Sequence, residues 1–139
     1  MDHLSKEFWS ERYQNDKTGW DLGTISPTIK GFFDKIEDKS VRILIPGCGN
    51  SYEAEYLFNN GFVNVHVIDL TEEPLQNLKL RIPTFPDAQL HVGDFFEHKE
   101  TYDFIVEQTM FCAINPSLRK AYSDKSHQLL STGGMIVGL

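Results

Sequence analysis

The sequence has few cysteines, few basic residues and no long apolar run, and each scarcity argues against a class of protein. Its two cysteines, Cys48 and Cys112, lie far apart, which indicates reduced thiols in a cytoplasmic protein rather than a disulfide framework. Thirteen basic residues against twenty acidic ones give a net charge of −7, so neither a nucleic acid nor a membrane is expected as a partner. The N-terminus lacks the apolar region of a signal peptide, and no segment is apolar for long enough to span a bilayer.

Residue patterns typical of metal and hydrolytic sites are also missing. Neither cysteine has the spacing of a metal ligand, and the five histidines are scattered along the chain, so no metal site is expected. The sequence shows no Ser-His-Asp set and no pair of carboxylates at a productive spacing. These absences leave no residue to be named as catalytic.

The 139 residues leave room for one domain, and 40% apolar composition with ten phenylalanines suits a folded globule. A single core and a negative net charge are compatible with a monomer, which is the default expectation. Helices are predicted at 4–17, from 26 onward, at 51–60, near 72–81 and near 116–131. Strands are predicted at 41–46, 63–69, 88–93, 102–107 and from Met135, after the glycine pair 133–134 ends the last helix. This alternation predicts an α/β fold, a doubly wound and mainly parallel sheet.

The most informative segment is residues 41–51, which combine a buried strand, a glycine turn and a helix start. A second buried strand ends in Asp69. Glycines let the backbone approach a ligand, a helix N-terminus offers free N–H groups, and a carboxylate accepts hydrogen bonds from a ribose diol. The combination favours a nucleoside-containing cofactor. The alternatives are an ordinary tight turn for the glycines and a helix N-cap for Asp69, although Thr71 is the better cap.

The glycine turn narrows the choice of cofactor. A dinucleotide fingerprint has the form G-x-G-x-x-G, but Tyr52 stands at the third glycine position and leaves only Gly47 and Gly49. A ligand without a pyrophosphate fits better, and S-adenosylmethionine contains an adenosine and an amino acid but no phosphate. A nicotinamide-dependent oxidoreductase is the alternative enzyme, because Asp69 would serve its ribose equally well.

Other candidate residues follow the carboxyl ends of further strands, where open α/β sheets bind their ligands. Asp94 could accept a hydrogen bond from an adenine amino group, with Phe95 lining the ring, or it is a solvated turn residue. Gln108, just past a strand end, would meet the cofactor or face water. Trp20 lies in a predicted loop and would either cover the cofactor or fill the core.

These residues lie within an ordered series of motifs. The series resembles the thiopurine S-methyltransferase superfamily, and most closely its plant-type thiol and halide methyltransferases. The most specific motifs are Trp-Asp-x-Gly at 20–23 and Phe-Cys-Ala-Ile-x-Pro at 111–116. The other matching segments are Phe8-Trp9 with Tyr13, Pro27, 45–49, 67–69, 93–96, Arg119 and Tyr122. The motifs extend over nearly the whole chain and follow one another in the same order as in the family.

The resemblance implies a Rossmann-like class I methyltransferase that binds S-adenosylmethionine through a single domain, residues 1–139. Its N-terminal helices and cofactor lid would lie in 1–40, and its core in 41–139. The implied cofactor-binding residues are Trp9, Tyr13, Trp20, Gly47, Gly49, Asp69, Asp94, Phe95 and Gln108. The plant-like relatives carry tryptophan where this chain has Tyr13, and they also differ at Gln108. Arg119 is expected to anchor its helix rather than bind ligand.

The implied reaction is an in-line transfer of a methyl group to a small thiol, a thiopurine-like heterocycle, or a halide or bisulfide ion. Such acceptors are good nucleophiles, so orientation and exclusion of water would suffice and no catalytic residue is assigned. Glu107 or Tyr102 could assist a protonated thiol, or each is a structural strand-end residue. The family's last two strands and a Gly-Pro-Pro substrate loop lie beyond Leu139, so the chain is expected to be truncated, and a non-catalytic cofactor-binding module is a further alternative.

Overall fold

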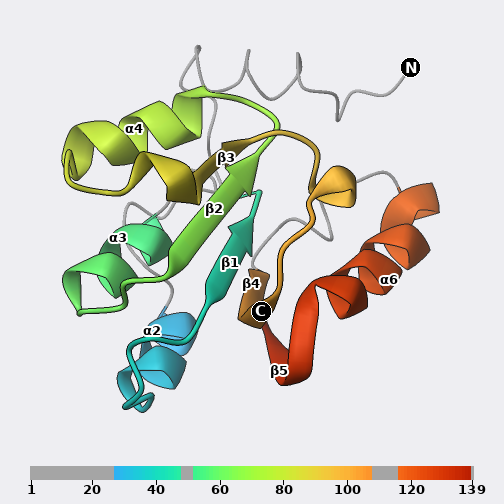
Figure 1. Cartoon of the computed structure of the whole chain (residues 1–139), viewed down its shortest axis with the longest axis horizontal. Helices are drawn as coiled ribbons and strands as arrows, with labels where there is room; N and C mark the ends of the chain where they lie inside the picture. The colour runs from blue at the N-terminus through green and yellow to red at the C-terminus, as the bar shows by residue number, and fades with distance from the viewer. Residues whose placement is uncertain (1–26, 48–51, 108–115, 139) are drawn as a thin grey trace.

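A computed structural model of the chain describes residues 27–47, 52–107 and 116–138. These residues form a five-stranded sheet in the order β3-β2-β1-β4-β5, with every neighbouring pair parallel (Figure 1). The strands are β1 (Ile43–Pro46), β2 (Val65–Asp69), β3 (Leu90–Val92), β4 (Tyr102–Glu107) and β5 (Leu130–Gly138). The chain adds β2 and β3 on one side of β1 and then β4 and β5 on the other, so the strand order reverses at β1.

Helices cover both faces of this sheet. The described helices are α2 (Pro27–Asp34), α3 (Tyr52–Asn59), α4 (Glu73–Arg81) and α6 (Arg119–Leu129), with short 3₁₀ turns η1 (Asp87–Gln89), η2 (Phe95–Glu97) and η3 (Pro116–Leu118). Helices α2, α3 and α4 lie on one face and α6 on the other (Figure 1). Among the described residues, no helix combines the length and the apolar character that a membrane crossing would need.

The alternation of side chains along β1 and β2 divides the core into two clusters. Ile43, Ile45 and Val67 point toward α2, α3 and α4, whereas Leu44 and Ile68 belong to the cluster on the face of α6. All four residues of β1 are buried, as expected for a parallel strand that is covered on both faces. Because these strands are parallel, the carboxyl ends of β1, β2 and β3 lie at one edge of the sheet.

The five predicted strands all form, and β4 has the predicted bounds, but the last helix and strand do not begin and end where expected. The prediction carried the helix to 131 and began the strand at Met135, whereas α6 ends at Leu129 and β5 starts at Leu130. The glycine pair lies inside the strand, where the register against β4 shifts and Gly133 has a φ of 83°. Glycine here permits an irregularity within a strand, not the end of a helix.

Gly134→Ala is expected to destabilise the protein by about 1–3 kcal/mol, because its added Cβ would overpack a rigid site. That Cβ would lie 3.0 Å from the backbone oxygens of both Asp103 and Ser131. Urea unfolding measures the change. Gly31→Ala is the matched control, since its Cβ would meet no atom within 4 Å and alanine favours the helix. Equal stabilities for the two variants would contradict the prediction.

Candidate functional site

The candidate site lies where the carboxyl ends of β1 and β2 meet, beside the reversal of strand order. The Gly47 N–H donates to the carbonyl oxygen of Ile68 at 2.9 Å, and the Gly93 N–H donates to that of Asp69 at 2.9 Å. Gly47 has a φ of 57°, in the left-handed region that favours glycine. These bonds hold three successive strand ends in one row, at the edge where sheets of this type bind ligands.

Asp69 ends β2 with its carboxylate held by the residue two positions on. Its Oδ1 accepts hydrogen bonds from the backbone N–H and from the hydroxyl of Thr71, both at 3.0 Å. Burial raises the pKa of Asp69, and the Thr71 bonds oppose that rise. Neither residue caps the next helix, since the N-cap of α4 is Glu72. The expectation that Thr71 is the better cap was therefore wrong, because α4 begins later than the sequence suggested.

Asp94 and Phe95 follow β3 and build a turn. The Oδ1 of Asp94 accepts a hydrogen bond from the Phe96 N–H at 2.9 Å, which caps η2, and the side chain is exposed. Phe95 is only 3% exposed, and its ring stacks on Tyr122 with a centroid distance of 5.0 Å. The turn alternative for Asp94 is therefore present in the structure, and the adenine contacts assigned to both residues stay predictions.

Five of the candidate residues lie outside the described part of the chain, and their cofactor contacts stay predictions: Trp9, Tyr13, Trp20, Gly49 and Gln108. Arg119 begins α6 and is partly buried, and its expected anchoring role likewise stays a prediction. Of the nine implied cofactor residues, the described part thus brings together Gly47 and Asp69 on adjacent strand ends, with Asp94 following the next strand.

The two residues considered as helpers of the acceptor lie at opposite ends of β4. Glu107 ends the strand at the ligand edge. Burial raises the pKa of Tyr122 on α6, and the negative charge of Glu107 raises it further. Tyr102 begins the strand, is fully buried, and shares a 2.7 Å hydrogen bond with the Nε2 of His98. A six-residue strand is about 17 Å long. Tyr102 therefore lies too far from the ligand edge to assist an acceptor there, and only its structural role fits the fold.

Comparison with known proteins identifies the family. The model of the thiopurine S-methyltransferase family matches residues 4–139. The chain belongs to the thiopurine S-methyltransferase family. This confirms the resemblance drawn from the tryptophan, glycine-turn and Phe-Cys-Ala-Ile motifs of the sequence.

Individual relatives agree with the thiopurine S-methyltransferase assignment. The chain is 28% identical over 146 residues to the probable thiol methyltransferase 2 of Arabidopsis thaliana, covering 100% of this chain and 63% of that protein. It is 24% identical over 148 residues to a thiopurine S-methyltransferase of Vibrio cholerae, covering 94% of this chain and 67% of that protein. The chain thus spans less than two thirds of the length of the Arabidopsis relative.

A solved structure confirms the Rossmann-like methyltransferase fold of this family member. The 1,6-didemethyltoxoflavin-N1-methyltransferase of Burkholderia thailandensis, solved with its substrate and S-adenosylhomocysteine, superposes with a TM-score of 0.75. The alignment covers 96% of this chain and 60% of that one at 18% sequence identity. At that identity the likeness concerns the fold, including the parallel sheet that places the candidate site.

Proposed function

We propose that this member of the thiopurine S-methyltransferase family binds S-adenosylmethionine and transfers its methyl group to a small, soft nucleophile. The observation that carries the proposal is the pairing of left-handed Gly47 with Asp69 at adjacent strand ends, in a chain that the family model matches over residues 4–139. A ligand can approach the backbone of a glycine turn closely, and a carboxylate at the next strand end can accept hydrogen bonds from its ribose. This arrangement fits an adenosine that carries no pyrophosphate.

The residues on this edge fit such a cofactor in distinct roles. The Gly47 turn has no Cβ to block the backbone from the amino-acid part of the ligand. Because the Oδ1 of Asp69 is already engaged by Thr71, the ribose hydroxyls would donate mainly to the other carboxylate oxygen. Asp94 and Phe95 would flank the adenine, and the candidates outside the described residues would make the remaining contacts: Trp9, Tyr13, Trp20, Gly49 and Gln108.

When bound, S-adenosylmethionine supplies a methyl group on a sulfonium, which is already electrophilic. The chain's own residues then have to orient the two reactants and exclude water, not to create a nucleophile. This favours a thiol, a thiopurine-like heterocycle, or a halide or bisulfide ion as acceptor. The relatives are named as a thiol methyltransferase and a thiopurine methyltransferase, which supports the same class of acceptor.

Calorimetric titration of the purified protein with S-adenosylmethionine, S-adenosylhomocysteine and NAD tests the cofactor. We expect the two adenosyl ligands to bind with one site per chain and NAD to give no heat of binding. Binding of NAD alone would instead support an oxidoreductase and overturn the proposal.

The transfer step has a separate test, the formation of S-adenosylhomocysteine with a small thiol, a thiopurine, iodide or bisulfide as acceptor. Turnover with at least one of these is expected. Cofactor binding without turnover on any of the four would contradict the transfer step and support a cofactor-binding module instead.

A further inference from the structure

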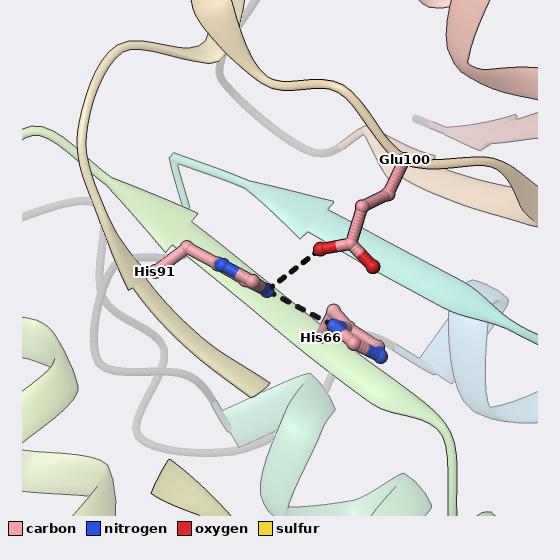
Figure 2. Close-up of side chains that lie close together, drawn as sticks. All are labelled: His66, His91 and Glu100. Carbon is pink, nitrogen blue, oxygen red and sulfur yellow. Dashed lines mark hydrogen bonds and ion pairs between the residues drawn. The ribbon is translucent and has the colours of Figure 1, made fainter. Parts of the chain in front are cut away.

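A second group of polar side chains lies on the sheet, on the face that carries α6. It consists of His66 on β2, His91 on β3 and Glu100 in the segment that leads into β4 (Figure 2). The register pairs His91 with Ile68, which lies two residues after His66 on the same face of β2. The histidines that are scattered in the sequence therefore meet in the fold, and the spacing argument against a metal site loses its basis.

The ligand atoms of these three residues converge. The Nδ1 of His66 lies 3.0 Å from the Nε2 of His91, and that Nε2 lies 3.8 Å from the Oε2 of Glu100. All three atoms lie within 4.8 Å of one another. Because zinc holds nitrogen and oxygen ligands at about 2.1 Å in a tetrahedral arrangement, two of its ligand atoms lie about 3.4 Å apart. The 3.0 Å His66–His91 pair would therefore open by about 0.4 Å, and any pair at the 4.8 Å limit would close by about 1.4 Å.

Both imidazoles are at least partly buried, and burial disfavours their charged form. The residue His66 is 7% exposed, and its burial, aided by the charge of Arg42, lowers its pKa to about 4. Burial also lowers the pKa of His91, whose side chain is 22% exposed. A neutral imidazole nitrogen offers the lone pair that a metal ion needs. Glu100 is more exposed, at 38%, and leaves the cluster open to ions from solution.

The carboxylate of Glu100 is oriented by its neighbours. Arg42 donates from Nη2 to the Oε1 of Glu100 at 2.8 Å and from Nε to the carbonyl oxygen of Thr101 at 2.8 Å. These bonds leave the Oε2 directed at the histidines, with the Nε2 of His98 also 4.0 Å away. The positive charge of the Arg42 guanidinium repels a bound cation. The binding free energy from the three ligands would therefore have to exceed this repulsion.

We propose that His66, His91 and Glu100 form a binding site for a divalent transition-metal ion of the zinc type. Two imidazoles and a carboxylate are ligands that zinc accepts, and three protein ligands leave a fourth position for water. One of the two histidine nitrogens carries the shared hydrogen, so that ring takes its other tautomer on ligation. The ion ties β2, β3 and the approach to β4 together, away from the candidate cofactor edge.

Titration of chelator-treated protein tests the site. Zinc is measured in competition with a chromogenic chelator, and cobalt by its visible absorption. We expect one ion per chain, a melting temperature that rises with zinc concentration, and cobalt bands without a thiolate charge-transfer transition. A thiolate band would place the ion at Cys48 or Cys112 and overturn the proposal.

Variants decide between this site and a network of hydrogen bonds without metal. His91→Asn and Glu100→Gln are each expected to weaken zinc binding at least tenfold, and Glu100 is exposed enough for its variant to fold. His127→Asn, on the exposed side of α6, is the matched control and should bind as the parent does. Unchanged affinity in Glu100→Gln, or no zinc bound at one equivalent, would refute the site.

Discussion

Replacing Asp69 by asparagine is expected to weaken the binding of S-adenosylmethionine by about 100-fold. Charge-assisted hydrogen bonds contribute about 1.5–3 kcal/mol each, and a ribose diol would donate two of them to this carboxylate. Losing both corresponds to two or more factors of ten in affinity. In the variant, the single amide oxygen would stay with Thr71, so an NH₂ group would face the ribose hydroxyls. Calorimetric titration gives the two dissociation constants.

The same substitution is expected to leave the melting temperature at neutral pH unchanged or higher. Burial raises the pKa of Asp69 above its ordinary value. A carboxyl group with a raised pKa in the fold contributes its stability below the unfolded pKa and loses it as pH rises through the folded pKa. Asparagine keeps the oxygen acceptor for Thr71 but never ionises, so it avoids that loss. Scanning calorimetry at pH 7 measures the difference.

Asp124→Asn is the control for both measurements, because this exposed acid on α6 forms a surface ion pair with Lys120. Its affinity and melting temperature should match those of the parent. If Asp69→Asn bound S-adenosylmethionine as tightly as this control, the ribose role would be wrong. A clear fall in melting temperature would instead show that Asp69 supports the fold, and any loss of affinity would then be indirect.

Phe33→Ala is expected to lower the free energy of unfolding by about 3–5 kcal/mol. Phe33 is completely buried in the cluster beneath α2. Its ring contacts those of Phe32, Phe62 and Phe104 edge-on, with centroid distances of 5.1, 5.8 and 5.6 Å. Alanine would lose both the apolar transfer energy and these ring contacts, and it would leave a cavity. Since domains are stable by about 5–15 kcal/mol, a large share of the population could unfold.

Urea unfolding of a graded series checks this prediction. Phe33→Leu should lose less than Phe33→Ala, because it keeps most of the buried volume. Leu80→Ala is the exposed control, since Leu80 is 79% exposed, and its change should stay within about 0.5 kcal/mol. If Phe33→Ala lowered the free energy of unfolding by less than about 1 kcal/mol, the buried cluster beneath α2 would contribute little to stability.

Local pattern predicted the strands well and the last helix end poorly. Strands such as 102–107 are short apolar runs bounded by polar residues, and that pattern depends only on neighbours in the chain. The glycine pair 133–134 misled the prediction because glycine serves helix ends and strand irregularities alike. Its pairing with β4 decides which of the two applies, and that contact joins residues far apart in sequence.

The candidate site was partly predictable for a similar reason. A glycine turn and a strand-end acid are local features, so Gly47 and Asp69 could be named before the fold was known. The engagement of Asp69 by Thr71 is also local, since the two residues are two positions apart, whereas the burial of Phe95 against Tyr122 depends on how α6 packs. Tyr102 begins the predicted strand just as it begins β4, so its distance from the ligand edge follows from the strand bounds and from the parallel direction of the sheet.

The sequence by itself determined the alternating strands and helices, the nucleoside-type glycine turn and the family, because each depends on short motifs and local periodicity. Only the tertiary structure brought His66, His91 and Glu100 together. Their meeting requires the parallel register of β2 and β3, which is set by crossover connections and by packing on both faces of the sheet. The spacing of these residues along the chain does not show that strand pairing brings them into contact.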